Sequence, residues 1–328
     1  MLARQFDWLI VLLMVPTLSW AANDNPQQAR RWLDRMAEAN QRQSYQGTFV
    51  YRCDEQLTTM KLVHAAGADR TREKLVALNG PEQVLIQDGQ LLSALAATGG
   101  QRIWARKHAP FGLFMRSGEI GNEIDRFYGA AMVGEDRIAG RVAERLKLTP
   151  TDGLRNGFKL WVDKETGVVL RSDMLDSQGE VIEQVMFTQI EFISPSAADK
   201  AVDSSSSLVA PAELSEPSQT ALVAHTTPTP WRIAAMPPGF GVAERYVRAA
   251  TETSLAQEQW VLSDGLASVS VFFERQSHAP RKPFQGTTRR GAVNAMGVLV
   301  AGHQVTVVGE VPMATVKMIS ESLQFSPN

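Results

Sequence analysis

The feature that most restricts the fold of this chain is a long series of short, β-branched and aromatic runs separated by glycine turns. The series extends from Tyr45 to Phe192, with an interruption over residues 108–131. Such runs, bounded by Gly or Asn-Gly, are typical of strands joined by hairpins. The turn signals are Gly67, Asn79-Gly80, Asp88-Gly89, Gly99-Gly100, Gly140, Gly167 and Gly179. We therefore predict a meander of antiparallel strands.

Two helical segments are available to fill the concave side of this meander. Residues 25–43 begin with Asn25-Pro26, a capping residue followed by a first-turn proline, and then repeat apolar residues at helical spacing. A second, shorter helix is predicted at about residues 122–131. Long meanders with one apolar face curl around whatever fills their concave side. The sequence therefore predicts a sheet that wraps around helices.

A change of composition marks the end of this first domain, residues 22–194. Residues 195–230 are rich in serine, proline and alanine and contain almost no aromatic residues. Such a stretch buries too little surface to offset the entropy lost on ordering, so we interpret it as a flexible linker. Residues 231–328 resume strand-like runs, with a hairpin signal at Asp264-Gly265 and a final helix after Pro312. We interpret them as a second, smaller domain.

The first residues have the pattern of an export signal. Trp8 to Leu18 form an apolar run, and Ser19 and Ala21 place small residues before the expected cleavage site. The run is too short to cross the roughly 30 Å of membrane hydrocarbon as a helix. No cysteine follows for attachment of a lipid. We therefore predict a signal peptide over residues 1–21 and an exported, soluble mature chain.

Known catalytic motifs are missing from this sequence. It has no phosphate-binding loop, dinucleotide fingerprint or nucleophile elbow, and no zinc motif; its five histidines are scattered. We predict a protein that is not an enzyme and that holds no metal or cofactor. The one cysteine, Cys53, cannot form an internal disulfide. It is either a packed small apolar residue, or a reactive thiol or an intermolecular link.

One candidate binding segment interrupts the first domain. It combines Phe111, Leu113, Phe114 and Met115 with proline and glycine, an apolar density that loops normally avoid. The flanking basic residues are Arg106, Lys107 and Arg116. We interpret these residues as a lipid site, with an apolar wall for acyl chains and cations for headgroup phosphates. The alternative is a segment that packs into its own core, with ordinary surface charge beside it.

A second candidate site is a basic cluster in the second domain. The chain as a whole, with 33 basic and 35 acidic residues, has no field that would attract nucleic acid. Any basic site must therefore be local. The cluster consists of Arg281, Lys282, Arg289 and Arg290. It suits an acidic peptide partner, and the alternative is again ordinary surface charge.

Several ordered motifs of the chain resemble those of the RseB/MucB family. In the first domain they are Tyr45-Gln46-Gly47-Thr48-Phe49-Val50-Tyr51, Val133–Arg141, Leu160–Asp163 and Leu170–Asp176. In the second domain they are Met236-Pro237-Pro238-Gly239-Phe240, Ser263–Phe272 and Val307–Pro312. The resemblance covers nearly the whole mature chain, with the linker in its expected place.

This resemblance implies an α+β protein. Its N-terminal domain would be an antiparallel half-barrel wrapped around helices, as in LolA/LppX carriers, and its C-terminal domain a smaller α+β unit. It implies a periplasmic protein that binds the periplasmic domain of an RseA/MucA-like anti-sigma factor. Bound there, the family shields that factor from the site-1 protease, represses the envelope-stress sigma factor and senses lipid or lipopolysaccharide. The alternative is a LolA-like lipid or lipoprotein carrier, although a simple carrier would not need the second domain. Whether the chain forms a homo-oligomer is left open.

Overall fold

The computed structural model describes residues 26–67, 70–80, 83–88, 91–96, 101–105, 122–204, 223–224, 229–248, 257–275 and 283–326. The predicted signal peptide, residues 1–21, lies outside these ranges, as does most of the predicted linker. The described chain forms two units. We call residues 26–204 the N-terminal unit and residues 223–326 the C-terminal unit. Neither unit, where described, contains a helix long and apolar enough to cross a membrane.

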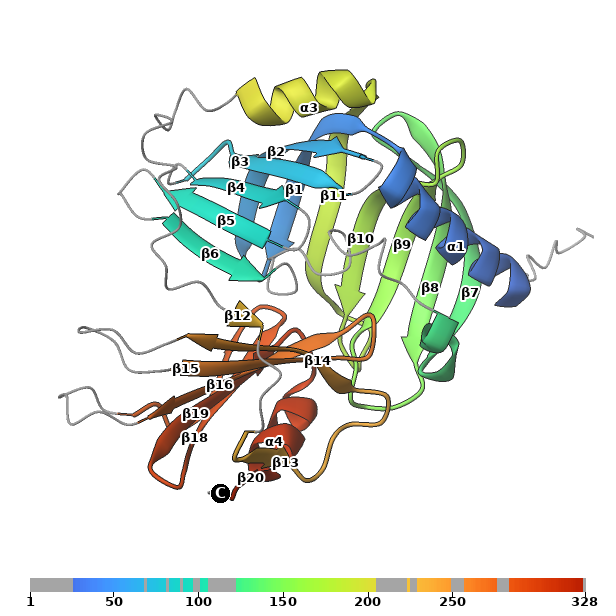
Figure 1. The fold of residues 1–328 in the computed structure, drawn as a ribbon. Helices are drawn as coiled ribbons and strands as arrows, with labels where there is room; N and C mark the ends of the chain where they lie inside the picture. The colour runs from blue at the N-terminus through green and yellow to red at the C-terminus, as the bar shows by residue number, and fades with distance from the viewer. Residues whose placement is uncertain are drawn as a thin grey trace, which may run out of the picture.

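The N-terminal unit is an open, curved antiparallel sheet of eleven strands (Figure 1). In sheet order the strands are β6 (Gln101–Ala105), β5 (Leu91–Ala96), β4 (Gln83–Asp88), β3 (Arg72–Ala77), β2 (Gln56–Ala65), β1 (Tyr45–Cys53), β11 (Val181–Phe192), β10 (Val169–Leu175), β9 (Gly157–Asp163), β8 (Arg141–Pro150) and β7 (Tyr128–Ile138). Two meanders, β1–β6 and β7–β11, are joined where β1 pairs with β11, from Tyr45 opposite Phe192 to Cys53 opposite Glu183. The predicted half-barrel fold is confirmed.

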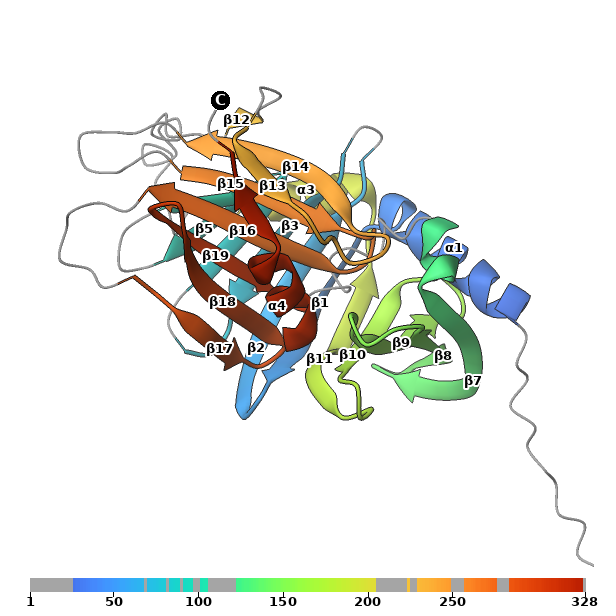
Figure 2. The same ribbon diagram turned by 90° about the horizontal axis from the view of Figure 1, so that it is seen from below.

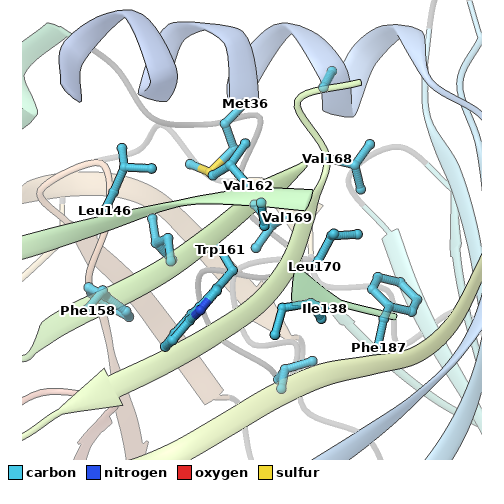
Figure 3. Packing of buried hydrophobic residues seen from close by; sticks show 14 of the residues in the cluster. Met36, Ile138, Leu146, Phe158, Trp161, Val162, Val168, Val169, Leu170 and Phe187 are labelled. Carbon is cyan, nitrogen blue, oxygen red and sulfur yellow. The ribbon is translucent and has the colours of Figure 1, made fainter. Parts of the chain in front are cut away.

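Helix α1 (Pro26–Arg42) lies across the concave side of this sheet (Figures 1 and 2). Its helical repeat places Ala29, Leu33, Met36 and Ala39 on one buried face. Figure 3 shows Met36 pointing from the helix into the cluster that contains Leu146, Val162 and Phe187. Burial of each large side chain of this kind stabilises the fold by about 1.5–3 kcal/mol. The helix and sheet therefore form one core.

The short helix predicted at residues 122–131 is wrong beyond its first turn. A 3₁₀ turn, η3, covers Asn122–Arg126, and strand β7 begins at Tyr128. Tyr128 to Ala131 pair with Pro150 to Lys147 of β8. The strand overrides the local helical propensity, because pairing with β8 places Tyr128 and Met132 on the buried face of the sheet, and local propensity does not record such tertiary packing.

Helix α3 (Pro195–Asp203) occupies the first nine residues of the stretch in which composition predicts a linker. Ser194 caps it by accepting a hydrogen bond from Ala197 N, and proline fits its first turn. Ala198 and Val202, four residues apart, pack against Val63 and Ala65 of β2. This small apolar face explains why a serine- and alanine-rich segment is ordered here.

The C-terminal unit is a second antiparallel sheet with one helix on its face (Figure 2). Its strands, in sheet order, are β12 (Val223–Ala224), β14 (Gly241–Arg248), β15 (Gln257–Ser263), β16 (Ser268–Arg275), β19 (His303–Gly309), β18 (Val293–Val300) and β17 (Gly286–Arg290). Helix α4 (Met313–Glu321) follows Pro312, and a two-stranded sheet pairs β13 (Trp231–Ile233) with β20 (Leu323–Phe325). The core of the C-terminal unit includes Trp231, Phe273, Val316 and Ile319. The smaller α+β unit is thus confirmed.

Candidate functional site

Most of the predicted site residues lie outside the described part of the chain. This holds for the whole predicted lipid segment, namely Arg106, Lys107, Phe111, Leu113, Phe114, Met115 and Arg116, and for Arg281 and Lys282. Arg289 and Arg290 are described, on strand β17. The predicted lipid site therefore stays a prediction. Of the predicted partner site, the structure describes Arg289 and Arg290.

Strand β17 is the last strand of the C-terminal sheet, and all five of its residues are exposed. It pairs with β18, Arg289 opposite Asn294 and Arg290 opposite Val293. In the described ranges no strand pairs with its other edge. An exposed edge offers unpaired backbone groups to an added strand. The Arg289 Nε donates to the Gly291 carbonyl at 3.0 Å, which holds this side chain beside the edge.

The end of β17 lies against the N-terminal unit. The Arg290 Nη2 donates to Gln56 Oε1 at 3.3 Å, and the Gly291 amide donates to Asp54 Oδ2 at 2.6 Å. Gly291 has φ +59, and a Cβ built on it would overlap the Cys53 sulfur. The turn after β17 thus sits on the β1–β2 turn so closely that only glycine fits. The half-buried Cys53 thiol is therefore part of the contact between the units.

A second contact between the units centres on Arg155, in the loop between β8 and β9. Its side chain is 0 % exposed, and the Arg155 Nε donates to Asp264 Oδ2 at 2.5 Å. Its two terminal nitrogens donate to Asp152 and to the Pro238 carbonyl. The guanidinium carbon lies 4.3 Å from the ring centre of Phe127 and 5.2 Å from that of Phe240. We call this group the Arg155 clasp.

Further contacts join the C-terminal unit to the half-barrel. Leu266 and Ala292, from two hairpin turns of the C-terminal unit, are buried in the core of the N-terminal unit. Asn156 Nδ2 donates to the Glu310 carbonyl at 3.1 Å, and Thr315 Oγ1 donates to the Leu154 carbonyl at 2.6 Å. The two units therefore share one interface of apolar and polar contacts.

A half-buried tyrosine, Tyr51 of β1, packs against the core of the N-terminal unit near this interface. The Tyr51 hydroxyl donates to Glu183 Oε2 at 3.1 Å. Burial, and after it the charge of Glu183, raises the pKa of Tyr51 far above its ordinary value. Tyr51 therefore stays protonated, and its hydroxyl can donate to Glu183. No metal site is indicated either, because the described residues contain no group of three His, Cys, Asp or Glu side chains that could hold an ion.

An open groove of about 590 Å³ lies between the first turns of α1 and the start of β7. Its lining residues are Pro26, Gln27, Arg30, Arg31, Asp125, Tyr128, Gly129 and Ala130. Arg30 is balanced by Asp34 at 2.8 Å and Asp125 at 3.5 Å, whereas Arg31 is exposed. Apolar walls with a guanidinium rim suit an amphiphile with an anionic headgroup. Sequence analysis did not identify this groove, because its residues come from separate segments.

The clasp could not be found from the sequence, although two of its segments were noted there. Asp264-Gly265 was interpreted as a hairpin turn, and Met236 to Phe240 was noted as a family motif. The structure brings both segments onto Arg155. Nothing in the sequence around Arg155 indicates that this residue is buried, because a buried arginine depends on acceptors supplied by distant segments.

Comparisons with known proteins match both units to the two domains of one family. The MucB/RseB N-terminal domain family matches residues 28–206, and the MucB/RseB C-terminal domain family matches residues 225–324. The chain is 30% identical to the sigma factor AlgU regulatory protein MucB of Pseudomonas aeruginosa, over 96% of each protein.

Two solved complexes match in three dimensions. The complex of Pseudomonas aeruginosa MucA and MucB matches with a TM-score of 0.69 and 28% identity, over 92% of this chain and 100% of the other. A complex of MucB with MucA(peri) matches with a TM-score of 0.66 and 28% identity, over the same shares of both chains. In both cases the match extends over the N-terminal and the C-terminal unit.

Proposed function

Because the chain belongs to the MucB/RseB family, we propose that it regulates a sigma factor by binding the periplasmic domain of a MucA-like membrane protein. The family is one of regulatory, binding proteins, and it is not a known enzyme family. The observation that carries the proposal is the match of both units, over 92% of the chain, to MucB solved with its MucA partner. The partner is an anti-sigma factor, and the place of action is the periplasm, which the predicted signal peptide supports.

The exposed edge of β17 is the surface that we propose for contact with this partner. An extended peptide can add to such an edge as a further strand, so that main-chain hydrogen bonds supply affinity. Arg289 and Arg290 stand on this strand and would pair with carboxylates of the peptide. With Arg281 and Lys282 just before it in the chain, the edge suits an acidic segment. A segment held as a β-strand is inaccessible to a protease, and this is how we propose that the chain shields its partner from the site-1 protease.

Charge reversal tests this contact. We expect Arg289→Glu with Arg290→Glu to weaken binding of the MucA-like periplasmic domain from the same genome, because two attractive contacts become repulsive. The matched control is Arg232→Glu, which reverses an exposed arginine on β13, away from the β17 edge. Affinity is measured by calorimetry at two salt concentrations. Equal loss in the control, or no loss in the double variant, would remove β17 from the binding surface.

We further propose that lipid acts on the N-terminal unit. The groove beside α1 offers Arg30 and Arg31 next to apolar walls, and the predicted segment from Arg106 to Arg116 supplies further apolar and basic residues. Lipid can release the partner only if it binds better to a state that holds the partner poorly. Linkage then requires that lipid and partner weaken each other by the same factor, typically roughly 5- to 150-fold. Titration of each ligand with and without the other measures this factor, and a factor of one would refute lipid release.

A further inference from the structure

The geometry assigns Arg155 as a positioning residue: it sets the angle at which the C-terminal unit meets the half-barrel. It thereby sets where the β17 edge, the surface proposed to hold the partner, lies relative to the N-terminal unit. The part of this inference that concerns the partner rests on the proposed function. The part that concerns the angle between the units stands on the contacts of Arg155 alone.

Arg155 is held by acceptors from several directions at once. A guanidinium is planar and carries five N–H donors in a fixed fork. Here that fork meets Asp152 from its own loop, Asp264 from the β15–β16 turn and the Pro238 carbonyl from the β13–β14 loop. Three acceptors on three segments can be satisfied together in one orientation only. A rotation of the C-terminal unit would break at least one of these hydrogen bonds.

The ion pair at the centre of the Arg155 clasp is inaccessible to water. The side chains of Arg155 and Asp264 are 0 % and 1 % exposed. Phe127 from the N-terminal unit and Phe240 from the C-terminal unit lie against the guanidinium. Replacing a buried ion pair by apolar residues often leaves stability unchanged, whereas one unpaired buried charge is costly. Any orientation of the C-terminal unit that separates Asp264 from Arg155 would leave a buried charge unpaired and is disfavoured.

The backbone of the C-terminal unit approaches the N-terminal unit closely beside the Arg155 clasp. Gly239 has φ +80, and a Cβ built on it would overlap the ring of Phe127. The stiff turn that contains Pro237 and Pro238 thus reaches the N-terminal unit without any intervening side chain. The Asp264 Oδ1 also accepts hydrogen bonds from the amides of Leu266 and Ala267. These bonds orient the carboxylate so that its other oxygen, Oδ2, faces Arg155. Both turns of the C-terminal unit are therefore rigid where they touch Arg155.

A matched control is present on β10 of the N-terminal sheet. Arg171 pairs with Asp173 through two hydrogen bonds, at 2.8 and 2.6 Å, and its guanidinium lies 4.1 Å from the ring centre of Trp161. Its chemistry is that of the clasp, but all its partners belong to the N-terminal unit. Arg171→Met removes such an ion pair without touching the interface between the units.

The test measures the angle between the units directly. Spin labels are attached to the exposed positions Gln178 and Lys317, one in each unit, after Gln178→Cys and Lys317→Cys in a Cys53→Ser background. Distances between the labels are recorded for the full mature chain, for Arg155→Met and for the Arg171→Met control. We expect a single narrow distance for the parent and the control, and a broad distribution for Arg155→Met.

Partner binding is measured on the same proteins with the MucA-like periplasmic domain. Arg155→Met is expected to weaken binding roughly 5- to 150-fold, the usual range of coupling between distant sites, while Arg171→Met binds as the parent does. Arg155→Lys keeps the charge but not the planar fork and is expected to restore neither property. A narrow distance in Arg155→Met, or unchanged affinity despite a broad one, overturns the inference.

A second variant covers the case in which Arg155→Met does not fold. Asp264→Asn keeps the oxygen that accepts from Leu266 and Ala267 but turns an amide donor toward Arg155, so it breaks the clasp from the other unit. It is expected to broaden the distance distribution in the same way, and a narrow distribution overturns the inference. If the parent does not bind the MucA-like domain at all, the proposed function fails, and the distances still decide whether Arg155 fixes the angle.

Discussion

Replacement of Gly291 by alanine perturbs the interface between the two units at a single atom. Gly291 has φ +59, and its new Cβ would overlap the Cys53 sulfur. The next nearest atoms are Asp54 Oδ2 at 3.6 Å and the Cys53 Cβ at 3.7 Å, which are ordinary contacts. The clash therefore comes from the sulfur alone. Removal of that sulfur by Cys53→Ala should relieve it.

The expected loss of stability in Gly291→Ala has two parts, one from backbone strain and one from the clash. An alanine in the left-handed region costs about 1–2 kcal/mol relative to glycine. Forcing an extra methyl group into packed surroundings costs a further 1–3 kcal/mol, roughly. Gly291→Ala should thus lower stability by about 2–5 kcal/mol. Gly302→Ala is the control: Gly302 has φ +75 but no atom within 4 Å of a built Cβ, so only the first part applies.

The assay is urea unfolding of a double-mutant cycle: parent, Gly291→Ala, Cys53→Ala and both together, with Gly302→Ala alongside. Unfolding is followed by circular dichroism and tryptophan fluorescence, and each transition is compared separately because two units need not unfold in one step. The double variant should recover the packing part, a coupling of about 1–3 kcal/mol. Equal losses in Gly291→Ala and Gly302→Ala, or no recovery in the double variant, would refute the close approach of the two turns.

Two further predictions concern acid stability and lipid. Burial is the largest influence on Asp163 and opposes its ionisation, but hydrogen bonds from Arg141 and Thr166 outweigh it, so the pKa of Asp163 lies below its ordinary 3.8. Its stabilisation is complete above pH 3.8 and is lost as the pH falls through the lower folded value. Asp163→Asn should cost roughly 1.5–3 kcal/mol at neutral pH and flatten this acid dependence in unfolding curves; an unchanged slope would contradict it. Phe114→Asp should weaken lipid binding in a vesicle assay while the fold, checked by circular dichroism, persists. Full lipid affinity in the folded variant would reject the predicted lipid segment, and loss of the fold would support its alternative role in the core.

Local patterns predicted most of the strands of this fold, and long-range contacts account for what they missed. The turns at Gly140, Gly167 and Gly179 could be identified from the sequence because tight turns often need a positive φ, which glycine adopts without strain. The structure shows a positive φ at all three glycines. The pairing of β1 with β11 was not predicted, since no local signal records which strands meet across the chain. The helical pattern after Asn122 was overridden by the ladder with β8.

Composition misled in one place for a similar reason. Residues 195–203 have the average composition of a linker. The four-residue spacing of Ala198 and Val202 nevertheless gives them one apolar helix face, which an average over the segment does not reveal. Two residues of the candidate site, Arg289 and Arg290 on β17, could be identified from the clustering of basic residues in the sequence. The clasp could not, because three acceptors from separate segments decide whether Arg155 is buried.

The central claim, that the chain holds a MucA-like partner, is tested most directly by calorimetric titration of residues 22–328 with the MucA-like periplasmic domain from the same genome. The complex of Pseudomonas aeruginosa MucB and MucA, which has been solved, is the positive control for the assay. We predict saturable binding that is weakened by salt, because arginine–carboxylate contacts contribute to it. Absence of saturable binding, under conditions in which the control complex forms, would contradict the claim.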